Sequence, residues 1–152
     1  MKIKILFICL GNICRSPAAE GVMKALVHDA ERDEEFYIDS AGIGGWHVGQ
    51  HPDPRMVQAG KRRGYVFNSR ARQIAKTDFE DFDYILAMDE DNIQELRYKA
   101  PEYTNKIKLL ADYITVHKDV KVVPDPYYGD DYDFDYALDL IEDACQGLLG
   151  TL

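Results

Sequence analysis

The stretch that most constrains the fold of this chain is Cys9-Leu10-Gly11-Asn12-Ile13-Cys14-Arg15-Ser16-Pro17. The apolar run 5–8 before it has the length of a buried strand, and the pattern after it predicts a helix from Ala18 to about Val27. A buried strand therefore delivers a cysteine into a tight loop that closes on the N-terminus of a helix. Loop amides and the helix dipole both favour an anion at such a place.

The cysteine at the start of this loop is expected to be an easily ionised nucleophile. A free cysteine has a pKa of about 8.5, and surroundings of this kind lower it to roughly 3.5–7.5. Arg15 follows Cys9 after five residues, so the loop can place its amides and the guanidinium group around one tetrahedral oxyanion above the sulfur. The alternative is a buried cysteine that only ends a strand. The position between a strand and a helix favours attack by sulfur on phosphorus.

The bulk properties of the chain narrow the class of protein. The 152 residues carry a net charge of −9, which argues against nucleic acid as a partner. We find no secretory signal and no apolar run that would span a membrane. Three widely spaced cysteines do not form a disulfide framework, so a reducing cytoplasm is the expected location. The length and the absence of linkers predict a single domain over residues 1–152.

Strand and helix patterns alternate along the whole chain. Strands are predicted at 2–8, 36–39, 82–88 and 106–110, and helices after Ser16, after Asp53, after Asp89 and over a C-terminal stretch whose apolar stripe runs from Phe134 to about Leu149. Residues 70–81 are predicted to form short helical turns, and 112–123 a loop. The alternation predicts an α/β fold with a parallel sheet. Ligands in such sheets bind at the carboxyl ends of strands, where Cys9 lies.

The loop and several later motifs resemble the low-molecular-weight protein tyrosine phosphatases. The later motifs are Asp39-Ser40-Ala41-Gly42, Trp46, Pro52-Asp53-Pro54-Arg55, Ala71-Arg72-Gln73, Met88-Asp89-Glu90 and Asp125-Pro126-Tyr127. They follow in order over nearly the whole chain, and a nucleophile that precedes a distant acid separates this family from larger phosphatases. The resemblance implies a single-domain, three-layer fold with a four-stranded parallel sheet, helices on both faces and flavodoxin-like topology. It also implies hydrolysis of phosphotyrosine without a metal or a cofactor.

The resemblance assigns the catalytic roles to three residues. Cys9 would attack phosphorus and form a phosphocysteine, and Asp125 would act as general acid and then as general base. Arg15 would bind phosphate together with the loop residues Leu10, Gly11, Asn12, Ile13, Cys14 and Ser16. The ordinary interpretation of the Asp-rich stretch 125–136 is an acidic, solvated loop. The Asp-Pro-Tyr context favours Asp125 over the other aspartates of this stretch.

Supporting residues are implied beneath the loop. Ser16 would hydrogen-bond Cys9, while Asn12 and Ser40 would hold the shape of the loop. Ser69 stands where the family often has a histidine that supports the loop asparagine, so we expect this one contact to differ.

An aromatic slot is expected above the loop. Trp46 and Tyr127 would form its walls, with Leu10 and Ile13 contributing to the lining. Such a slot would let the sulfur reach a phosphate only on a long aromatic side chain. The expected partners are phosphotyrosine proteins, and a cognate tyrosine kinase that could also phosphorylate Tyr127 or Tyr128.

The remaining cysteines and histidines are interpreted by their positions. Cys14 would form a reversible disulfide with Cys9 that protects the nucleophile from over-oxidation, and Cys145 would lie in the core. His47 and His51 are four residues apart, but Gly49 and Pro52 argue against a helix there, so no metal site is expected.

Two other functions remain open at this point. An arsenate reductase on the same fold shares the loop but relays electrons through further cysteines, commonly a pair in the middle of the chain, and none lies between Cys14 and Cys145. A phosphotyrosine-binding or redox-sensing module without turnover would not need Asp125.

Overall fold

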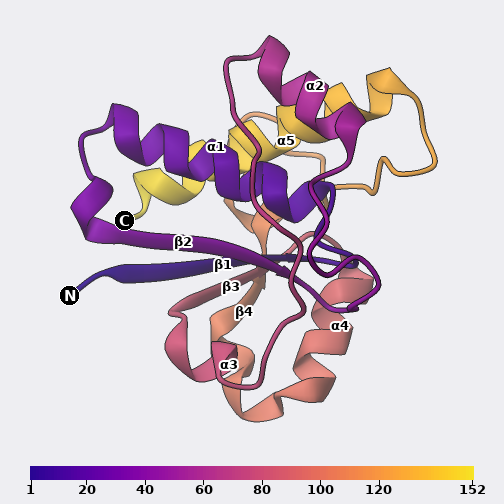
Figure 1. Ribbon diagram of the computed structural model, residues 1–152. Helices are drawn as coiled ribbons and strands as arrows, with labels where there is room; N and C mark the ends of the chain where they lie inside the picture. The colour runs from indigo at the N-terminus through magenta and orange to yellow at the C-terminus, as the bar shows by residue number, and fades with distance from the viewer.

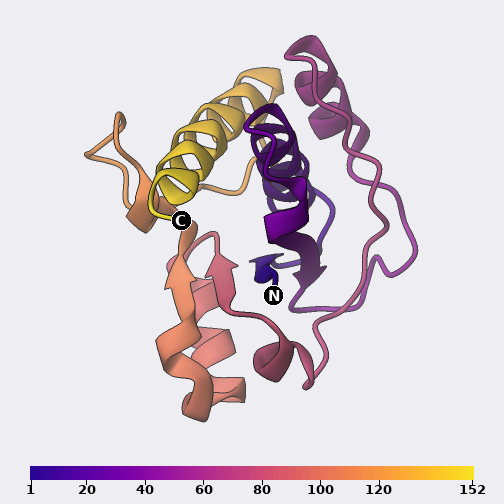
Figure 2. The same ribbon diagram turned by 90° about the vertical axis from the view of Figure 1, so that its left-hand side faces the viewer.

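The computed structural model describes all residues from 1 to 152 and confirms the α/β class. A parallel sheet forms the middle layer, with the strand order β2-β1-β3-β4. Its strands are β1 (Ile3–Cys9), β2 (Phe36–Gly42), β3 (Tyr84–Ala87) and β4 (Ile107–Leu109). Helices α1 (Arg15–Asp29), α2 (Pro54–Arg62) and α5 (Asp131–Gly150) cover one face, and α3 (Asp78–Asp81) and α4 (Glu90–Lys99) cover the other (Figures 1 and 2). Turns of 3-10 helix lie at Asp33–Glu35, Pro101–Lys106 and Leu110–Tyr113. The three layers and the flavodoxin-like order of the strands agree with the prediction.

The central strand β1 is buried on both faces, which explains its nearly continuous apolar sequence. Ile5 and Phe7 point into the core beneath α1 and α5, while Leu6 and Ile8 point into the core on the opposite face. β1 pairs with β2 on one side and with β3 on the other. Cys9 ends β1 between these two neighbours, at the edge of the sheet where α/β folds bind ligands.

Both helices that flank the predicted site begin earlier than the sequence pattern suggests. α1 begins at Arg15 and not at Ala18, because the loop already curls into helical geometry there, and Pro17 still lies in the first turn where its missing N–H costs nothing. α5 begins at Asp131, inside the acidic stretch. Asp130 and Asp133 form a reciprocal capping box at its N-terminus, which explains why an Asp-rich sequence begins a helix.

The prediction of short helical turns over 70–81 is wrong except for α3. Residues 72–74 run beside the end of β2: Gly42 N donates to Arg72 O at 2.8 Å, and Ile74 N donates to Gly42 O at 2.8 Å. This pairing with a distant strand outweighs the local sequence preference. Arg72 is further held by Asp39 and Asp78, whose carboxylates lie 3.0 and 2.9 Å from its guanidinium nitrogens.

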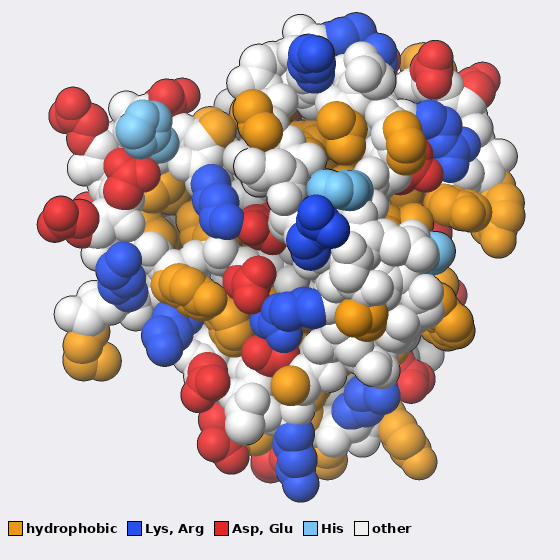
Figure 3. All heavy atoms as spheres, viewed as in Figure 1, with side chains coloured by type: hydrophobic (Ala, Val, Ile, Leu, Met, Phe, Trp, Pro, Cys, Tyr) orange, Lys and Arg blue, Asp and Glu red, His pale blue; other side chains and the backbone are white.

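The surface carries mixed charge. On the face shown in Figure 3, Lys and Arg side chains lie among Asp and Glu side chains and form no continuous basic stripe. No helix has the length and apolar character needed to cross a membrane.

A buried carboxylate on α5 anchors the loop that leads towards the site, and it makes stability depend on pH. Asp143 accepts hydrogen bonds from the backbone N–H groups of Thr115, Val116 and His117 at 2.8–3.1 Å and contacts Nδ1 of His117 at 2.7 Å. Burial of Asp143 opposes its ionisation, but these donors outweigh burial and hold its pKa well below the usual range.

Replacing Asp143 with alanine is therefore expected to destabilise the protein by about 3 kcal/mol near neutral pH. A carboxyl with a lowered folded-state pKa stabilises the protein above its unfolded pKa of about 3.9, and this contribution is lost as the pH falls through the folded-state value. Denaturant unfolding of the parent and Asp143→Ala should differ most above pH 5 and converge at lower pH. A difference that stays constant down to pH 2 would contradict this account.

Candidate active site

The loop after β1 turns its carbonyl groups outwards and leaves its amides free. Cys9 O accepts from Ile43 N at 3.0 Å, Leu10 O accepts from Gly44 N at 2.9 Å, and Ile13 O accepts from Asp53 N at 2.7 Å. The amides of residues 10–14 donate no hydrogen bond to any protein group. Free N–H groups on consecutive residues of a loop form an anion-binding concavity.

Two backbone features fix the position of this loop against the sheet. Asn12 adopts a left-handed conformation with φ of 58°, which asparagine tolerates better than most residues. A Cβ atom on Gly42 would lie 3.0 Å from the carbonyl carbon of Gly11 and 3.1 Å from the nitrogen of Asn12. Because both neighbours are backbone atoms that cannot move aside, β2 can pass this close only with glycine at its end.

Cys9, the predicted nucleophile, and the residues predicted to support it form one buried cluster. Cys9 Sγ lies 3.0 Å from Ser16 Oγ, and Asn12 Nδ2 donates to Ser16 Oγ at 2.7 Å and to Ser40 Oγ at 3.0 Å. Ser69 makes no hydrogen bond to Asn12. The remaining polar atom of Asn12, Oδ1, accepts instead from the backbone N–H of Arg72 at 3.0 Å.

Two acceptors from distant segments hold the guanidinium group of Arg15 in place. Its Nη1 donates to Asp89 Oδ2 at 2.6 Å and to the carbonyl oxygen of Val123 at 2.9 Å. Its Nη2 faces Asp125 at 3.6 Å. The sequence pattern indicated Asp89 only as the cap of α4, a role that it also has through Asn92 N. No local pattern signalled the contact to Val123, which lies 108 residues from Arg15.

Only one carboxyl group of the acidic stretch faces the pocket. Asp125 lines it, and Asp125 Oδ1 accepts from the backbone N–H of Tyr127 at 3.1 Å. Asp130 and Asp133 are engaged in the capping box, and Asp135 pairs with arginines at the end of α2. The geometry therefore distinguishes Asp125 from its neighbours.

An arginine joins this acid-bearing loop to the start of α2. The guanidinium of Arg55 is paired with Asp53 at 2.9 Å and lies over the ring of Tyr127, 5.4 Å from its centroid, and over that of Phe134 at 4.6 Å. Burial opposes ionisation of Asp53, but the hydrogen bonds from Arg55 outweigh burial and lower its pKa. Because Asp53 N also donates to Ile13 O, the Asp53–Arg55 pair connects the loop after β1 with the ring of Tyr127.

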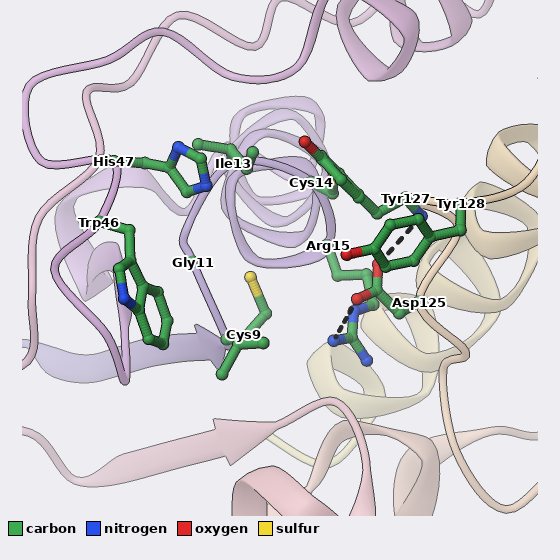
Figure 4. Close-up of a pocket in the computed structure, with 11 residues that line it drawn as sticks. Cys9, Gly11, Ile13, Cys14, Arg15, Trp46, His47, Asp125, Tyr127 and Tyr128 are labelled. Atoms are coloured by element: carbon green, nitrogen blue, oxygen red, sulfur yellow. Dashed lines mark hydrogen bonds and ion pairs between the residues drawn. The ribbon is translucent and has the colours of Figure 1, made fainter.

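These groups surround one pocket of about 210 Å³, with the sulfur of Cys9 at its base (Figure 4). Trp46 stands on one side, and Tyr127 and Tyr128 stand on the other. The other residues that line the pocket are Leu10, Gly11, Ile13, Cys14, Arg15, His47 and Asp125. Trp46 is 68% exposed and Tyr128 is 95% exposed, so both are available to a ligand.

His47 is a pocket residue that the sequence interpretation considered only as a metal ligand. Its Nδ1 lies 3.0 Å from Gln50 Oε1, and its ring packs against Gly11. Nowhere in the structure do three His, Cys, Asp or Glu side chains gather in a group that could hold a metal ion. The position of His47 beside the loop arises from the fold of 42–50, for which the sequence contains no local signal.

The other two cysteines differ from Cys9 in their surroundings. Cys14 is buried in the loop, and its burial together with the nearby Asp53 and Cys9 raises its pKa far above the ordinary value. Cys145 is fully buried in the core, where its Sγ lies 3.9 Å from Ala19 O, and burial raises its pKa as well.

A thiol at the base of an anion-binding loop, with an arginine beside it and a carboxyl group across the pocket, is the arrangement of a cysteine-dependent phosphatase. Comparison with known proteins identifies the protein family. The model of the family "Low molecular weight phosphotyrosine protein phosphatase" matches residues 4–152. The chain belongs to this family and is a protein tyrosine phosphatase.

Individual relatives agree with this membership. A putative low molecular weight protein-tyrosine-phosphatase of Synechocystis is 48% identical, over 98% of this chain and 96% of its own length. The crystal structure of a protein tyrosine phosphatase from Entamoeba histolytica superposes with a TM-score of 0.95 at 46% identity, covering 99% of this chain and all of the other. A Drosophila arginine phosphatase superposes with a TM-score of 0.90 at 38% identity, covering 98% and 97% of the two chains.

Proposed function

We propose that this protein hydrolyses phosphotyrosine in proteins through a phosphocysteine on Cys9, with residues 1–152 acting as one catalytic domain. Arg15 binds the phosphate, and Asp125 is the general acid and base. The observation that carries this proposal is that Cys9 Sγ, Arg15 and Asp125 meet in one pocket whose walls are Trp46 and Tyr127. The aromatic walls suit a phosphorylated phenol ring.

In the first step the thiolate of Cys9 attacks phosphorus in line with the bond to the phenolic oxygen. The sulfur–phosphorus bond forms as the phosphorus–oxygen bond breaks, and Asp125 gives its proton to the departing phenolate. Arg15 and the free amides of the loop neutralise the charge on the equatorial oxygens. Because Asp89 and Val123 hold Arg15 in place, this charge stabilisation costs little reorganisation during the reaction.

In the second step a water molecule attacks the phosphocysteine. Asp125, now a carboxylate, takes a proton from that water as its oxygen bonds to phosphorus. The sulfur–phosphorus bond breaks, inorganic phosphate is released, and the electron pair returns to Cys9. The Ser16 hydroxyl, 3.0 Å away, stabilises the sulfur as a leaving group.

The position of Cys145 argues against the arsenate reductase. An arsenate reductase relays electrons to further cysteines beyond the loop, but the one cysteine outside the loop, Cys145, is fully buried and contacts Ala19 in the core. A module that only binds phosphotyrosine would need no acid, and Asp125 faces the pocket from the opposite loop.

We also propose a redox role for Cys14 and a cytoplasmic setting. Oxidation of Cys9 by a peroxide gives a sulfenic acid, and attack by the Cys14 sulfur forms a disulfide and releases water. A reducing compartment keeps Cys9 reduced and restores it from the disulfide. The proposed partners are tyrosine-phosphorylated proteins and the kinase that phosphorylates them.

The proposed function is tested with three phosphorylated peptides that differ only in the modified residue. We expect release of inorganic phosphate from phosphotyrosine at least about a hundred times faster than from phosphoserine, because a short side chain cannot bring its phosphate to the sulfur. Phosphoarginine is the third substrate, since a structural neighbour is an arginine phosphatase. Faster release from phosphoarginine, or thiol-dependent reduction of arsenate without phosphatase turnover, would contradict the proposal.

A further inference from the structure

Glu20 is a buried carboxylate that has no part in the proposed reaction. It contacts Ser40, one of the residues that support the loop after β1. It lies on α1 and is only 6% exposed. Its Oε1 accepts from Ser40 Oγ at 2.5 Å, and its Oε2 accepts from Lys24 Nζ at 2.6 Å. Burying a carboxylate is costly unless it is paired, so its position needs an explanation in terms of what it contacts.

Glu20 is linked to Cys9 by a chain of hydrogen bonds through Ser40, Asn12 and Ser16. Which atom donates in each bond follows from the chemistry of the atoms. The backbone N–H of Arg72 can only donate, so the atom of Asn12 that faces it must be the carbonyl oxygen Oδ1. The amide nitrogen of Asn12 therefore faces the two serine hydroxyls and donates to both. A carboxylate only accepts, so the proton of the Ser40 hydroxyl points at Glu20.

The same logic settles the orientation of Ser16. Its oxygen accepts from Asn12 Nδ2 at 2.7 Å, so its own proton is left for the sulfur of Cys9 at 3.0 Å. A hydroxyl that donates to sulfur stabilises the thiolate, whereas one that accepts from sulfur stabilises the thiol. In the relay Glu20–Ser40–Asn12–Ser16–Cys9 the donors thus point away from Asn12 on both sides: Asn12 donates to both serines, Ser40 donates to Glu20, and Ser16 donates to the sulfur of Cys9.

We propose that Glu20 is a positioning residue that orients the Ser16 hydroxyl towards the Cys9 sulfur through Ser40 and Asn12. Because the Ser40 hydroxyl donates its proton to Glu20, its oxygen is free to accept from the second N–H of Asn12. This bond holds Asn12 in its left-handed backbone conformation. Lys24, 55% exposed, fixes the other oxygen of Glu20. In this chain Ser69 makes no bond to Asn12, so the Glu20–Ser40 pair provides that support instead. This inference rests on the proposed role of Cys9.

A double-mutant cycle tests the inference. Glu20→Ala should lower kcat about tenfold and move the pH midpoint of Cys9 alkylation by iodoacetamide to higher pH. In a Ser16→Ala background the same change should alter kcat less than about twofold, because its effect passes through Ser16. Glu20→Gln keeps an acceptor for Ser40 and should restore most of the activity. The other titratable groups of the pocket are unchanged in every variant; they are Cys14, Arg15, His47, Asp125, Tyr127 and Tyr128.

Two controls separate positioning from general destabilisation. Asp143→Ala removes an equally buried carboxylate on α5 and should lower the melting temperature without moving the alkylation profile. If Glu20→Ala does not fold, Ser40→Ala interrupts the same relay and should give the same loss.

The inference is overturned if the loss from Glu20→Ala is equal in the parent and Ser16→Ala backgrounds. It is also overturned if glutamine is as defective as alanine, or if the alkylation profile of Glu20→Ala matches the parent. Because alkylation requires no turnover, a failure here is distinguishable from a failure of the proposed function.

Discussion

Replacing Cys9 with serine is expected to abolish phosphatase turnover, with kcat falling by at least about four orders of magnitude. The variant keeps the shape of the pocket, because serine is only slightly smaller than cysteine. The Ser16 hydroxyl can still hydrogen-bond the side chain at position 9. It loses the proposed nucleophile, because an alcohol is a far weaker nucleophile than a thiol at neutral pH. The measurement is phosphate release from a phosphotyrosine peptide, together with mass spectrometry of acid-quenched protein for the phosphorylated cysteine.

Cys145→Ala is the matched control for this experiment. Cys145 lies in the core under α1 and outside the pocket, so a folded Cys145→Ala protein should keep the parent kcat. Cys9→Ser should still bind phosphotyrosine, because Arg15 and the loop amides remain. Turnover that persists in Cys9→Ser, or a covalent phosphate found on another residue of the parent, would remove Cys9 from the reaction.

The local part of the site could be predicted because its determinants are contiguous. A buried apolar run, a cysteine, five residues, an arginine and an amphipathic helix together dictate a strand, an anion-binding loop and a helix N-terminus. The α/β class followed equally directly from the alternation of patterns, since parallel strands need helical crossovers. These inferences require only short-range chain geometry.

The features that the sequence did not predict depend on contacts between segments that are distant along the chain. Residues 72–74 pair with the end of β2, and only this pairing brings the N–H of Arg72 to Asn12. The local sequence around Asp89 predicts a helix cap, and nothing in it indicates that the same carboxylate also accepts from Arg15. Glu20 follows the first turn of an amphipathic helix and pairs with Lys24 at i+4, as a surface residue would. Its burial arises because β2 and Ser40 pack over it.

The sequence predicted that Asp125 lies at the site, but it did not predict the contacts that support the loop carrying this residue. The Asp-Pro-Tyr context selected Asp125, and the structure brings that residue to within 3.6 Å of Arg15. That Arg55 lies over Tyr127 while pairing with Asp53 could not be read from the sequence, because the three residues come together only when α2 packs beside α5. The loop that carries Asp125 is thus tied to the loop after β1 by a contact that depends on the packing of helices.

Replacing Asp125 with asparagine is expected to lower kcat by about 10²–10⁴ for phenyl phosphate and by clearly less for p-nitrophenyl phosphate. Asparagine has nearly the same shape and can still accept from Tyr127 N, but it cannot give a proton to the leaving oxygen. Phenolate is a poor leaving group and needs that proton, whereas p-nitrophenolate leaves readily without it. The measurement is kcat over a series of aryl phosphates, plotted against the pKa of the released phenol. The dependence should be steeper in Asp125→Asn than in the parent.

The control for this prediction is Asp131→Asn, which removes a carboxylate from the same acidic stretch. Asp131 is exposed in the first turn of α5 and does not line the pocket, so its loss should leave kcat and its dependence on the leaving group at the parent values. A general effect of negative charge near the pocket would appear in both variants alike. Equal losses for good and poor leaving groups in Asp125→Asn would mean that the residue shapes the pocket without transferring a proton. In that case the acid would have to come from another group at the rim, and His47 is the one remaining titratable side chain there that is neither loop nor wall.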